Sequence, residues 1–185
     1  MIFWSILRLI QKTRLFLYDT MKGILDIIED NRKGIRSVCR FYASMSSFLS
    51  EEDIFQEVAF NLIKSYRKYE RRKECDTSTW VYRVAINVSI SMMRKESRMT
   101  FIPLDETFIA NQVVDEEIGI EDVKELYENI KQLDAEEQTL VFLYLDSKSY
   151  KEISEILGIS VTNVGTKLQR VKMKLKKLSH EDTKK

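Results

Sequence analysis

The sequence is poor in the residues that interrupt helices. It contains one proline, Pro103, and five glycines among 185 residues. Its longer stretches place apolar residues at helical spacing, without the alternation of β-branched residues that strands show. This scarcity disfavours a β-rich protein. We therefore expect an all-α protein, and with 44% hydrophobic residues the chain can bury one sizeable core or two small ones.

Cysteine and histidine are also scarce. Cys39 and Cys75 lie far apart without CxxC or Cys/His spacing, which indicates neither a disulfide framework nor a zinc site. The one histidine, His180, lies in the polar tail, and the chain has no glycine-rich phosphate loop and no suggestively placed nucleophile and base. An enzyme is therefore the weakest functional hypothesis. We expect no metal, no cofactor and a reducing cytoplasm as the compartment.

The chain has no uninterrupted apolar run of membrane-spanning length, even near its beginning. Residues 2–20 are apolar and aromatic, but Arg8, Lys12 and Arg14 interrupt them, and no clear cleavage site follows. Two interpretations of residues 1–20 stay open. They are an upstream misread start, with Met21 as the alternative start, or an amphipathic helix that docks on the first domain, a partner or a membrane surface.

The net charge of +1 conceals a strong segregation of charge. Residues 62–98 hold ten Lys/Arg against four Asp/Glu, residues 104–137 hold two against twelve, and residues 158–178 hold six against none. Two cationic regions therefore flank an anionic one. Charge runs are commonly solvated faces, but this order also fits two nucleic-acid contact surfaces separated by a stretch that repels or mimics phosphate.

The segment SYKEISEILGISVTNVGTKLQRVKMKLKKL, residues 149–178, predicts two helices hinged at Gly158. Ser149 and Glu152 form a capping box for the first helix, and Ser160 is a natural N-cap for the second. The second helix carries one apolar stripe, made of Val161, Val164, Leu168, Val171, Leu175 and Leu178. Its opposite side carries Thr162, Asn163, Thr166, Gln169 and Arg170.

A short helix, a glycine turn and a longer helix with polar residues near its start form the helix-turn-helix arrangement, whose second helix enters the major groove of DNA. Amide, hydroxyl and guanidinium groups contact base edges or phosphates there. Four later cations suit contact with the DNA backbone, namely Lys172, Lys174, Lys176 and Lys177. The pattern favours DNA binding. The competing interpretation is a basic amphipathic helix that packs on a partner.

Residues 52–98 predict two helical runs separated by a polar stretch at residues 71–78. Aromatic residues and cations are interleaved there, with Tyr66, Tyr69, Trp80 and Tyr82 among Arg67, Lys68, Arg71, Arg72, Lys73 and Arg83. Aromatic faces beside a cationic track suit unpaired bases, which stack while their phosphates are neutralised. The alternative is that Trp80, just inside a helix start that Thr77, Ser78 or Thr79 would cap, anchors the core.

Three stretches, in this order, resemble one known family. DIFQEVAFNLIKSY, STWVYRVAINVSISMMRKE and SYKEISEILGISVTNVGTKLQRVKMKL are similar to regions 2 and 4 of bacterial RNA polymerase sigma factors, specifically the two-domain extracytoplasmic-function (ECF) group of the sigma-70 family. The resemblance covers roughly residues 24–178. It implies a region 2 helical bundle at residues 21–98, an acidic linker at 99–119, a region 4 helix-turn-helix domain at 120–180 and a tail at 181–185.

The resemblance implies a sigma factor that binds core RNA polymerase and directs promoter-specific transcription initiation. Region 2 would capture a flipped base of the melted upstream element, and region 4 would read the distal element as duplex. An anti-sigma partner, often membrane-bound in the family, is also implied, and no small-molecule substrate. Weak DNA binding by the free protein would follow, since affinity tracks the phosphates neutralised. The alternative function is a stand-alone helix-turn-helix transcription regulator.

The same resemblance assigns the residues of region 2. Asp53, Gln56 and Glu57 match the helix that binds the polymerase clamp, although an ordinary solvated face would look the same. Asn87 matches the asparagine that lines the pocket of the flipped base, and an amide offers donors and acceptors to a base edge. The cations expected at the single-stranded DNA are Arg71, Arg72, Lys73 and Arg83. The loop RRKECDTS departs from the commoner version, which contains glycine and aromatic residues.

In region 4 the residues that match the recognition helix are Thr162, Asn163, Thr166, Lys167 and Arg170. Gly165 stands where the family usually has a basic residue, so one contact with DNA is expected to be missing. The family's proline after the leucine of LDAEEQ is replaced by Asp134, which we expect to cap the next helix. Acids of the linker, Asp105, Glu106 and residues 115–117, either thread the polymerase channel or belong to a simple tether.

Overall fold

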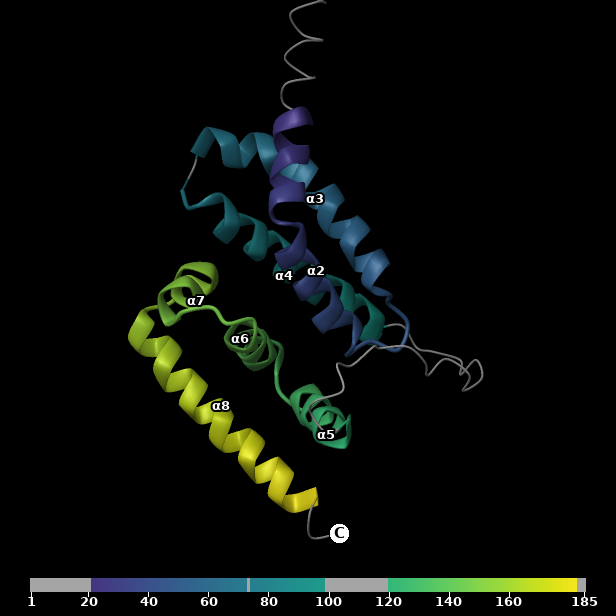
Figure 1. Ribbon diagram of the computed structural model, residues 1–185, viewed down its shortest axis with the longest axis vertical. Helices are drawn as coiled ribbons and strands as arrows, with labels where there is room; N and C mark the ends of the chain where they lie inside the picture. Colours follow the sequence, from purple (N-terminus) through teal and green to yellow (C-terminus); the bar gives the residue numbers. More distant parts are fainter. Residues whose placement is uncertain (1–20, 73, 99–119, 183–185) are drawn as a thin grey trace, which may run out of the picture. The chain divides into compact units, whose positions relative to one another are not determined.

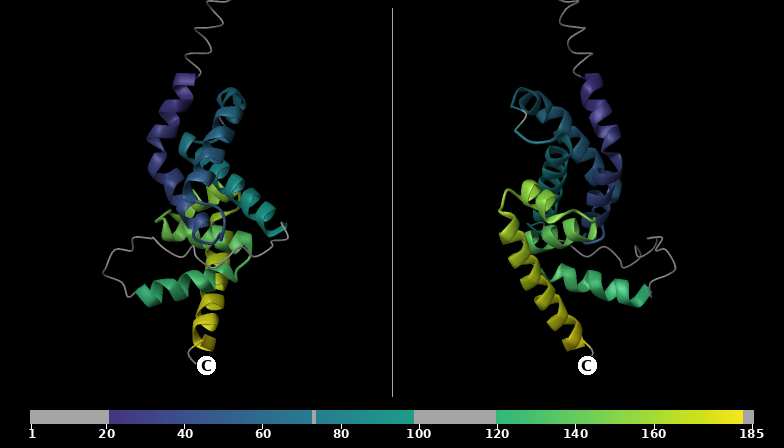
Figure 2. Two further views of the ribbon diagram at one scale, coloured as in Figure 1. Left: turned by 90° about the vertical axis from the view of Figure 1, so that its right-hand side faces the viewer. Right: turned by 60° about the vertical axis from the view of Figure 1, so that its left-hand side comes forward.

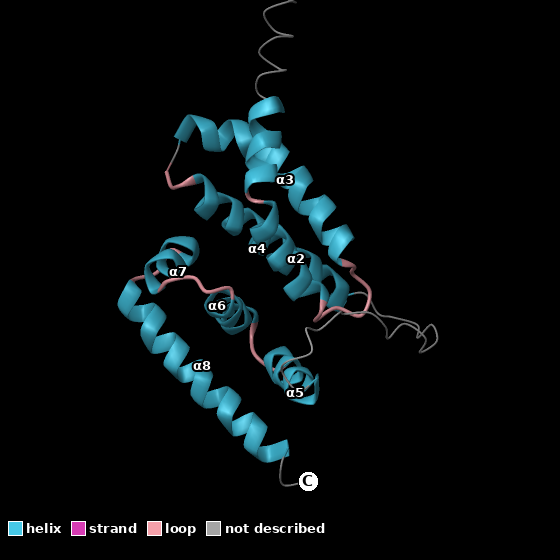
Figure 3. Cartoon of the chain, in the orientation of Figure 1, coloured by secondary structure: helices cyan, strands magenta, loops and turns pink. Residues whose placement is uncertain are grey.

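The computed structural model describes residues 21–72, 74–98 and 120–182, and the regular structure of these residues is entirely helical (Figure 3). The all-α expectation is therefore confirmed. The described residues divide into two compact units, the first within residues 21–43 and 49–89 and the second within residues 44–48, 90–98 and 120–182. The predictions for residues 1–20, Lys73 and the linker at 99–119 lie outside the described residues, and the exact domain boundaries stay predictions.

The first unit is built from helical residues 21–30 and three further helices (Figure 1). These are α2 (Arg32–Ala43), α3 (Glu51–Arg72) and the first part of α4 (Thr77–Arg98). Apolar residues three and four positions apart form one stripe on each helix, and these stripes pack together as the core. The core members include Ile35, Val38 and Tyr42 of α2, Ile54, Val58 and Leu62 of α3, and Val81 and Ala85 of α4.

Gly34 allows Tyr82 to enter this core. A Cβ atom built on Gly34 would lie 2.6 Å from the Tyr82 hydroxyl and 2.9 Å from its ring. These distances are shorter than van der Waals contact, so only glycine fits at this position without displacing the ring. Tyr82 is accordingly only 7% exposed. Its ring is packed inside the protein and is not a surface for a base.

The second unit contains α5 (Ile120–Lys131), α6 (Ala135–Leu145), α7 (Tyr150–Leu157) and α8 (Val161–Asp182). Figures 1 and 2 show α8 as a long helix beside α6 and α7. The buried residues of this unit include Ile130, Leu133, Leu140, Leu143, Ile153, Ile156, Val164, Leu168 and Val171. The apolar stripe expected on α8 is therefore largely present. It is wrong at Val161, which is the first residue of the helix and is 47% exposed.

The helix ends of this unit form as the sequence predicts. Asp134 caps α6 in a capping box with Glu137, and Ser149 caps α7 in a capping box with Glu152. Gly158 ends α7 with φ of 69°, a left-handed conformation that glycine adopts without steric cost. The turn at Gly158 leads the chain from α7 into α8. None of the helices within residues 21–72, 74–98 and 120–182 is long and apolar enough to cross a membrane.

Candidate nucleic-acid interface

The start of α8 presents a polar face to solvent. The hydroxyl of Ser160 accepts a hydrogen bond from the backbone N–H of Asn163 at 3.2 Å, which caps the helix as expected. Thr166 donates its hydroxyl proton to the Thr162 carbonyl at 3.1 Å and keeps lone pairs available. Val164, Leu168 and Val171 are buried, and the opposite side of α8 is exposed. It carries four of the five predicted duplex contacts, Thr162, Asn163, Thr166 and Arg170.

The fifth predicted contact, Lys167, forms an ion pair with a residue of α6. Its ammonium lies 2.7 Å from a carboxylate oxygen of Glu136. Two turns further along α8, Lys174 lies 2.7 Å from Glu137 in the same way. Sequence reasoning did not find these two carboxylates as partners of α8. Acids in a first helical turn are ordinary because they offset the helix dipole, so only the packing of α6 on α8 reveals the pairing.

The other cations of α8 have different surroundings. Lys172 lies 4.0 Å above the ring of Tyr144, and a hydrogen bond with the Tyr144 hydroxyl raises the pKa of its ammonium group. By contrast, Arg170, Lys176 and Lys177 form no ion pair with any residue whose side chain the structure describes, which excludes residues 180–185. Among the described side chains, three of the six cations of α8 therefore have a partner and three form no ion pair.

A shallow groove of about 660 Å³ runs beside the exposed face of α8. Its lining includes Tyr150 at the start of α7 and Gly165, Thr166 and Gln169 of α8. A Cβ atom on Gly165 would lie 3.6 Å from the Tyr150 ring, which is ordinary van der Waals contact. The fold therefore does not require glycine here, and the missing side chain widens the groove.

In region 2, Asn87 is exposed on α4. Arg83 lies four residues earlier, so both side chains project from the same face of the helix. The Arg83 guanidinium is half-buried, 3.9 Å from the sulfur of Cys75. Arg71 and Arg72 are exposed in the last turn of α3. The structure thus brings Arg83 and Asn87 together on α4 and leaves Arg71 and Arg72 at the end of the neighbouring helix.

The aromatic residues of this segment build the core beneath the loop between α3 and α4. The rings of Tyr69 and Trp80 stack at 4.3 Å with an angle of 10° between their planes. Trp80 is only 9% exposed, and Tyr66 is 8% exposed. The hydroxyl of Tyr69 bonds to that of Thr77 at 3.0 Å. Core packing is therefore the correct interpretation of Trp80, and Tyr66 belongs to the same buried core.

The start of α4 differs in detail from the sequence prediction. Thr77, Ser78 and Thr79 are the candidate caps in the sequence, but all three belong to the helix. The amide of Trp80 donates to the carbonyl of Asp76 at 3.0 Å, which makes Asp76 the residue that precedes the first turn. The hydroxyl of Thr77 bonds Tyr69, so it is occupied by the aromatic core.

The predicted clamp residues share an exposed face of α3. Asp53, Gln56 and Glu57 are all exposed. Ser50 donates its hydroxyl at 2.6 Å and its amide at 3.1 Å to the Asp53 carboxylate, and these bonds hold the pKa of that carboxyl below its usual value. Phe60 continues the same face one turn later and is 59% exposed. Sequence reasoning missed Phe60, although it lies outside the apolar stripe that faces the core.

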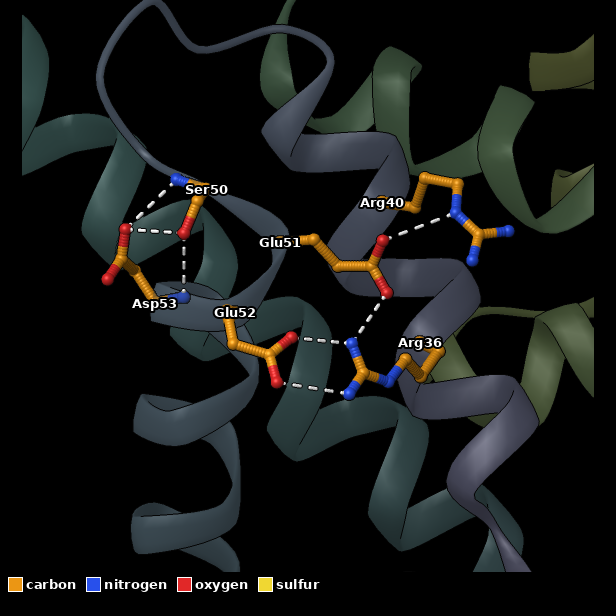
Figure 4. Close-up of polar contacts among 6 residues, drawn as sticks. All are labelled: Arg36, Arg40, Ser50, Glu51, Glu52 and Asp53. Carbon is orange, nitrogen blue, oxygen red and sulfur yellow. Dashed lines mark hydrogen bonds and ion pairs between the residues drawn. The ribbon is translucent and has the colours of Figure 1, made fainter. Parts of the chain in front are cut away.

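Two neighbouring acids of α3 have a structural role instead (Figure 4). Arg36 of α2 binds Glu52 at 2.6 and 3.2 Å and Glu51 at 3.0 Å, and Arg40 binds Glu51 at 3.3 Å. The hydrogen bonds from Arg36 lower the pKa of Glu52. These ion pairs fasten α2 to the first turn of α3. They occupy Glu51 and Glu52, whereas the Asp53 carboxylate bonds within its own helix cap and faces outward.

Within the described ranges, no group of three or more metal-ligating residues comes together. Cys39 and Cys75 are free thiols, and burial raises the pKa of Cys39 to about 12. The Cys39 thiol is therefore protonated near neutral pH and is a poor nucleophile.

Comparison with protein families gives matches to both units. The family model described as Sigma-70 region 2 matches residues 27–99, and the model described as Sigma-70, region 4 matches residues 124–175. The ECF RNA polymerase sigma factor SigW of Bacillus subtilis is 27% identical, over 86% of this chain and 88% of that protein. The ECF RNA polymerase sigma-E factor of Haemophilus influenzae is 26% identical, over 69% of this chain and 75% of that protein.

Two solved structures share the fold. CnrH, solved in complex with the cytosolic domain of CnrY, has a TM-score of 0.60 and 13% identity, covering 88% of this chain and 90% of that one. The sigma factor RpoE of Bartonella quintana, solved with the anti-sigma factor NepR, has a TM-score of 0.58 and 20% identity, covering 84% and 97%. This chain thus shares its fold with both solved structures.

Proposed function

We propose that this chain binds core RNA polymerase and directs transcription from specific promoters. The premise is that the chain belongs to the ECF group of the sigma-70 family of RNA polymerase sigma factors. The observation that carries the proposal is the exposed polar face of α8, which follows the glycine turn after α7. A second helix with such a face is the part of a helix-turn-helix that reads the major groove. Members of this family are transcription initiation factors and not catalysts, so we propose no enzymatic activity.

Region 4 contacts the distal promoter element as duplex. Asn163 and Arg170 supply an amide and a guanidinium to base edges or phosphates, and Thr162 and Thr166 supply hydroxyl groups. Lys167 is the least accessible of the five predicted contacts because it is paired with Glu136. It joins the contact only after leaving that carboxylate.

Region 2 captures the melted upstream element. Asn87 receives the flipped base, because its exposed amide can both donate to and accept from a base edge. Arg83 shares its face of α4, and Arg71, Arg72 and the predicted Lys73 supply positive charge for the single-stranded backbone. With Tyr66, Trp80 and Tyr82 buried, selectivity at this element depends on hydrogen bonding and charge more than on stacking.

The outer face of α3 binds the polymerase. Asp53 and Glu57 provide carboxylates for basic residues of the clamp, and Gln56 provides an amide. Phe60 adds an exposed apolar surface beside them, and exposed aromatic residues frequently supply much of the binding energy at an interface.

A regulatory partner is expected as well. Both structural neighbours were solved with a second protein, CnrY in one case and the anti-sigma factor NepR in the other. We therefore propose that an anti-sigma factor holds this chain inactive in the cytoplasm until a signal releases it. A stand-alone helix-turn-helix regulator is disfavoured because it leaves the match to region 2 without a role.

The proposal is tested by selecting DNA with reconstituted polymerase. Bacterial core enzyme is mixed with randomised duplex fragments, with and without the protein, and the retained fragments are sequenced. We expect retained fragments to share two spaced elements only when the protein is present. Arg170→Ala should weaken selection at the distal element and Asn87→Ala at the proximal one, whereas Lys151→Ala, on an exposed part of α7, should change neither. Retention that does not depend on the protein would contradict the proposal.

A further inference from the structure

We propose that Glu136 and Glu137 withhold two lysines of α8 from DNA phosphates and so limit the sequence-independent affinity of region 4. The inference rests on the proposed function, because it takes α8 to be the helix that binds duplex DNA. It adds two carboxylates outside α8 whose role is to compete with the DNA backbone. Neither carboxylate would touch DNA.

The geometry supports a paired arrangement. Glu136 and Glu137 are adjacent in the first turn of α6, and Lys167 and Lys174 lie seven residues apart on α8. Seven residues are about two helical turns, so the two lysines project from the same flank. Both ion pairs close at 2.7 Å between the ammonium nitrogen and a carboxylate oxygen. The two helices are thus joined at two points along that flank.

This flank borders the face that we expect to read DNA. Lys167 follows Asn163 by four residues and precedes Arg170 by three, and Lys174 follows Arg170 by four. Residues at these spacings are neighbours on a helix surface. An ammonium group released from α6 would therefore lie beside the exposed Asn163 and Arg170, where the phosphates of a bound duplex pass.

A carboxylate and a phosphate compete for the same lysine because both accept charge-assisted hydrogen bonds from its ammonium group. The pairs are partly exposed, with side-chain exposures of 32% and 60% for Lys167 and Glu136 and of 46% and 24% for Lys174 and Glu137. Ion pairs of this kind are weak. Each should therefore reduce affinity for duplex by only about two- to fivefold, and DNA can still recruit the lysines.

A purely structural role is the competing explanation. Glu137 also accepts the amide of Asp134 at 3.1 Å in the capping box, and acids in a first turn stabilise a helix through its dipole. That role predicts lower stability when the charges are removed and no change in DNA binding. Glutamine is a suitable replacement because its amide oxygen keeps the acceptor of the capping box.

The test is the salt dependence of binding to a short duplex of random sequence, measured by fluorescence anisotropy with the full-length protein. Between about 50 and 200 mM salt, each additional phosphate contact steepens the slope of log K against log salt by about 0.9. We expect Glu136→Gln to raise affinity about two- to fivefold and to steepen the slope by at most about 0.9, because the wild-type complex already recruits Lys167 in part. Glu128→Gln removes one negative charge whose partner is Lys131 of α5, so it is the matched control and should have little effect.

A double-mutant cycle identifies the lysine responsible. In the Lys167→Gln background, Glu136→Gln should no longer raise affinity, because no ammonium is left to release. The same cycle on Glu137 and Lys174 gives an independent repeat, and thermal melts check that each variant is folded. An equal gain in affinity with and without Lys167 would overturn the proposal, because the carboxylate would then act through long-range electrostatic repulsion of DNA. No gain in affinity in either background would also overturn it and would leave the ion pair with a purely structural role.

The outcomes also separate this inference from the proposed function. If the wild-type protein shows salt-dependent binding and Glu136→Gln does not alter it, the competition fails while the proposed DNA binding of the protein stands. If the wild type and every variant lack salt-dependent binding, then duplex binding by α8 fails and this inference fails with it.

Discussion

Replacing Gly165 by alanine should stabilise the protein, whereas the same change at Gly158 should destabilise it. Gly165 lies inside α8, where glycine costs about 1 kcal/mol relative to alanine. The added methyl group would meet the Tyr150 ring at 3.6 Å, an ordinary contact that adds no steric penalty. We therefore expect Gly165→Ala to raise the free energy of unfolding by about 1 kcal/mol.

Gly158 provides the matched control because it has open space but a left-handed backbone. No atom lies within 4 Å of a Cβ built there, yet its φ is 69°, a conformation that costs other L-residues about 1–2 kcal/mol. Gly158→Ala should therefore lower the free energy of unfolding. The free energies of unfolding of the two variants should differ by about 2–3 kcal/mol.

The assay is urea unfolding followed by circular dichroism, with hydrogen exchange of α8 peptides to locate the change. The explanation requires opposite signs for the two substitutions. A Gly165→Ala variant that is less stable than the wild type would refute the argument that the fold tolerates a side chain at this position. Equal losses of unfolding free energy in both variants would refute the claim that the backbone conformation, and not the space around the glycine, decides the sign of the effect.

Three further predictions concern region 2. Asn87→Ala should abolish promoter melting, measured by the permanganate reactivity of unpaired thymines, while binding to core polymerase persists. Ser91 is exposed one turn further along α4, and Ser91→Ala should leave both promoter melting and core binding unchanged. Phe60→Ala should weaken binding to core polymerase in gel filtration without lowering the melting temperature, because its ring is 59% exposed. Arg36 lowers the pKa of Glu52. The wild type should therefore be more stable than the Glu52→Gln variant above about pH 4.5, and this difference in the free energy of unfolding should disappear as the pH falls further. A difference that persisted in acid would contradict this pairing.

Local features of the fold could be predicted from the sequence because a few adjacent residues determine them. The capping boxes at Asp134 and Ser149 require only an acceptor and a glutamate three residues later, and the end of α7 requires only Gly158. The polar face of α8 follows from helical spacing alone. These features all formed as expected.

Contacts between distant residues could not be predicted in the same way. Lys167 and Glu136 are separated by 31 residues, and nothing in either segment indicates that their helices meet there. The close fit of Gly34 and Tyr82 is of the same kind. A cation in a basic helix therefore shows potential for DNA binding, while the structure decides whether its charge is already paired.

The aromatic cluster of region 2 illustrates a second limit of pattern. Aromatic residues among cations fit both a core and a surface for single-stranded DNA, and the two cannot be separated by spacing. The stacking of Tyr69 on Trp80 and the burial of Tyr66 decide for the core. Solvent exposure, which depends on the whole fold, is what distinguishes the two functions.

The most direct test of the central claim is to map where transcription begins. Core polymerase is combined with fragments enriched by the protein, and the 5′ ends of the transcripts are sequenced with and without it. We predict starts at a fixed distance downstream of the two shared elements, only when the protein is present and strongly reduced with Asn87→Ala. Starts that are the same with and without the protein would contradict its assignment as a sigma factor that directs initiation.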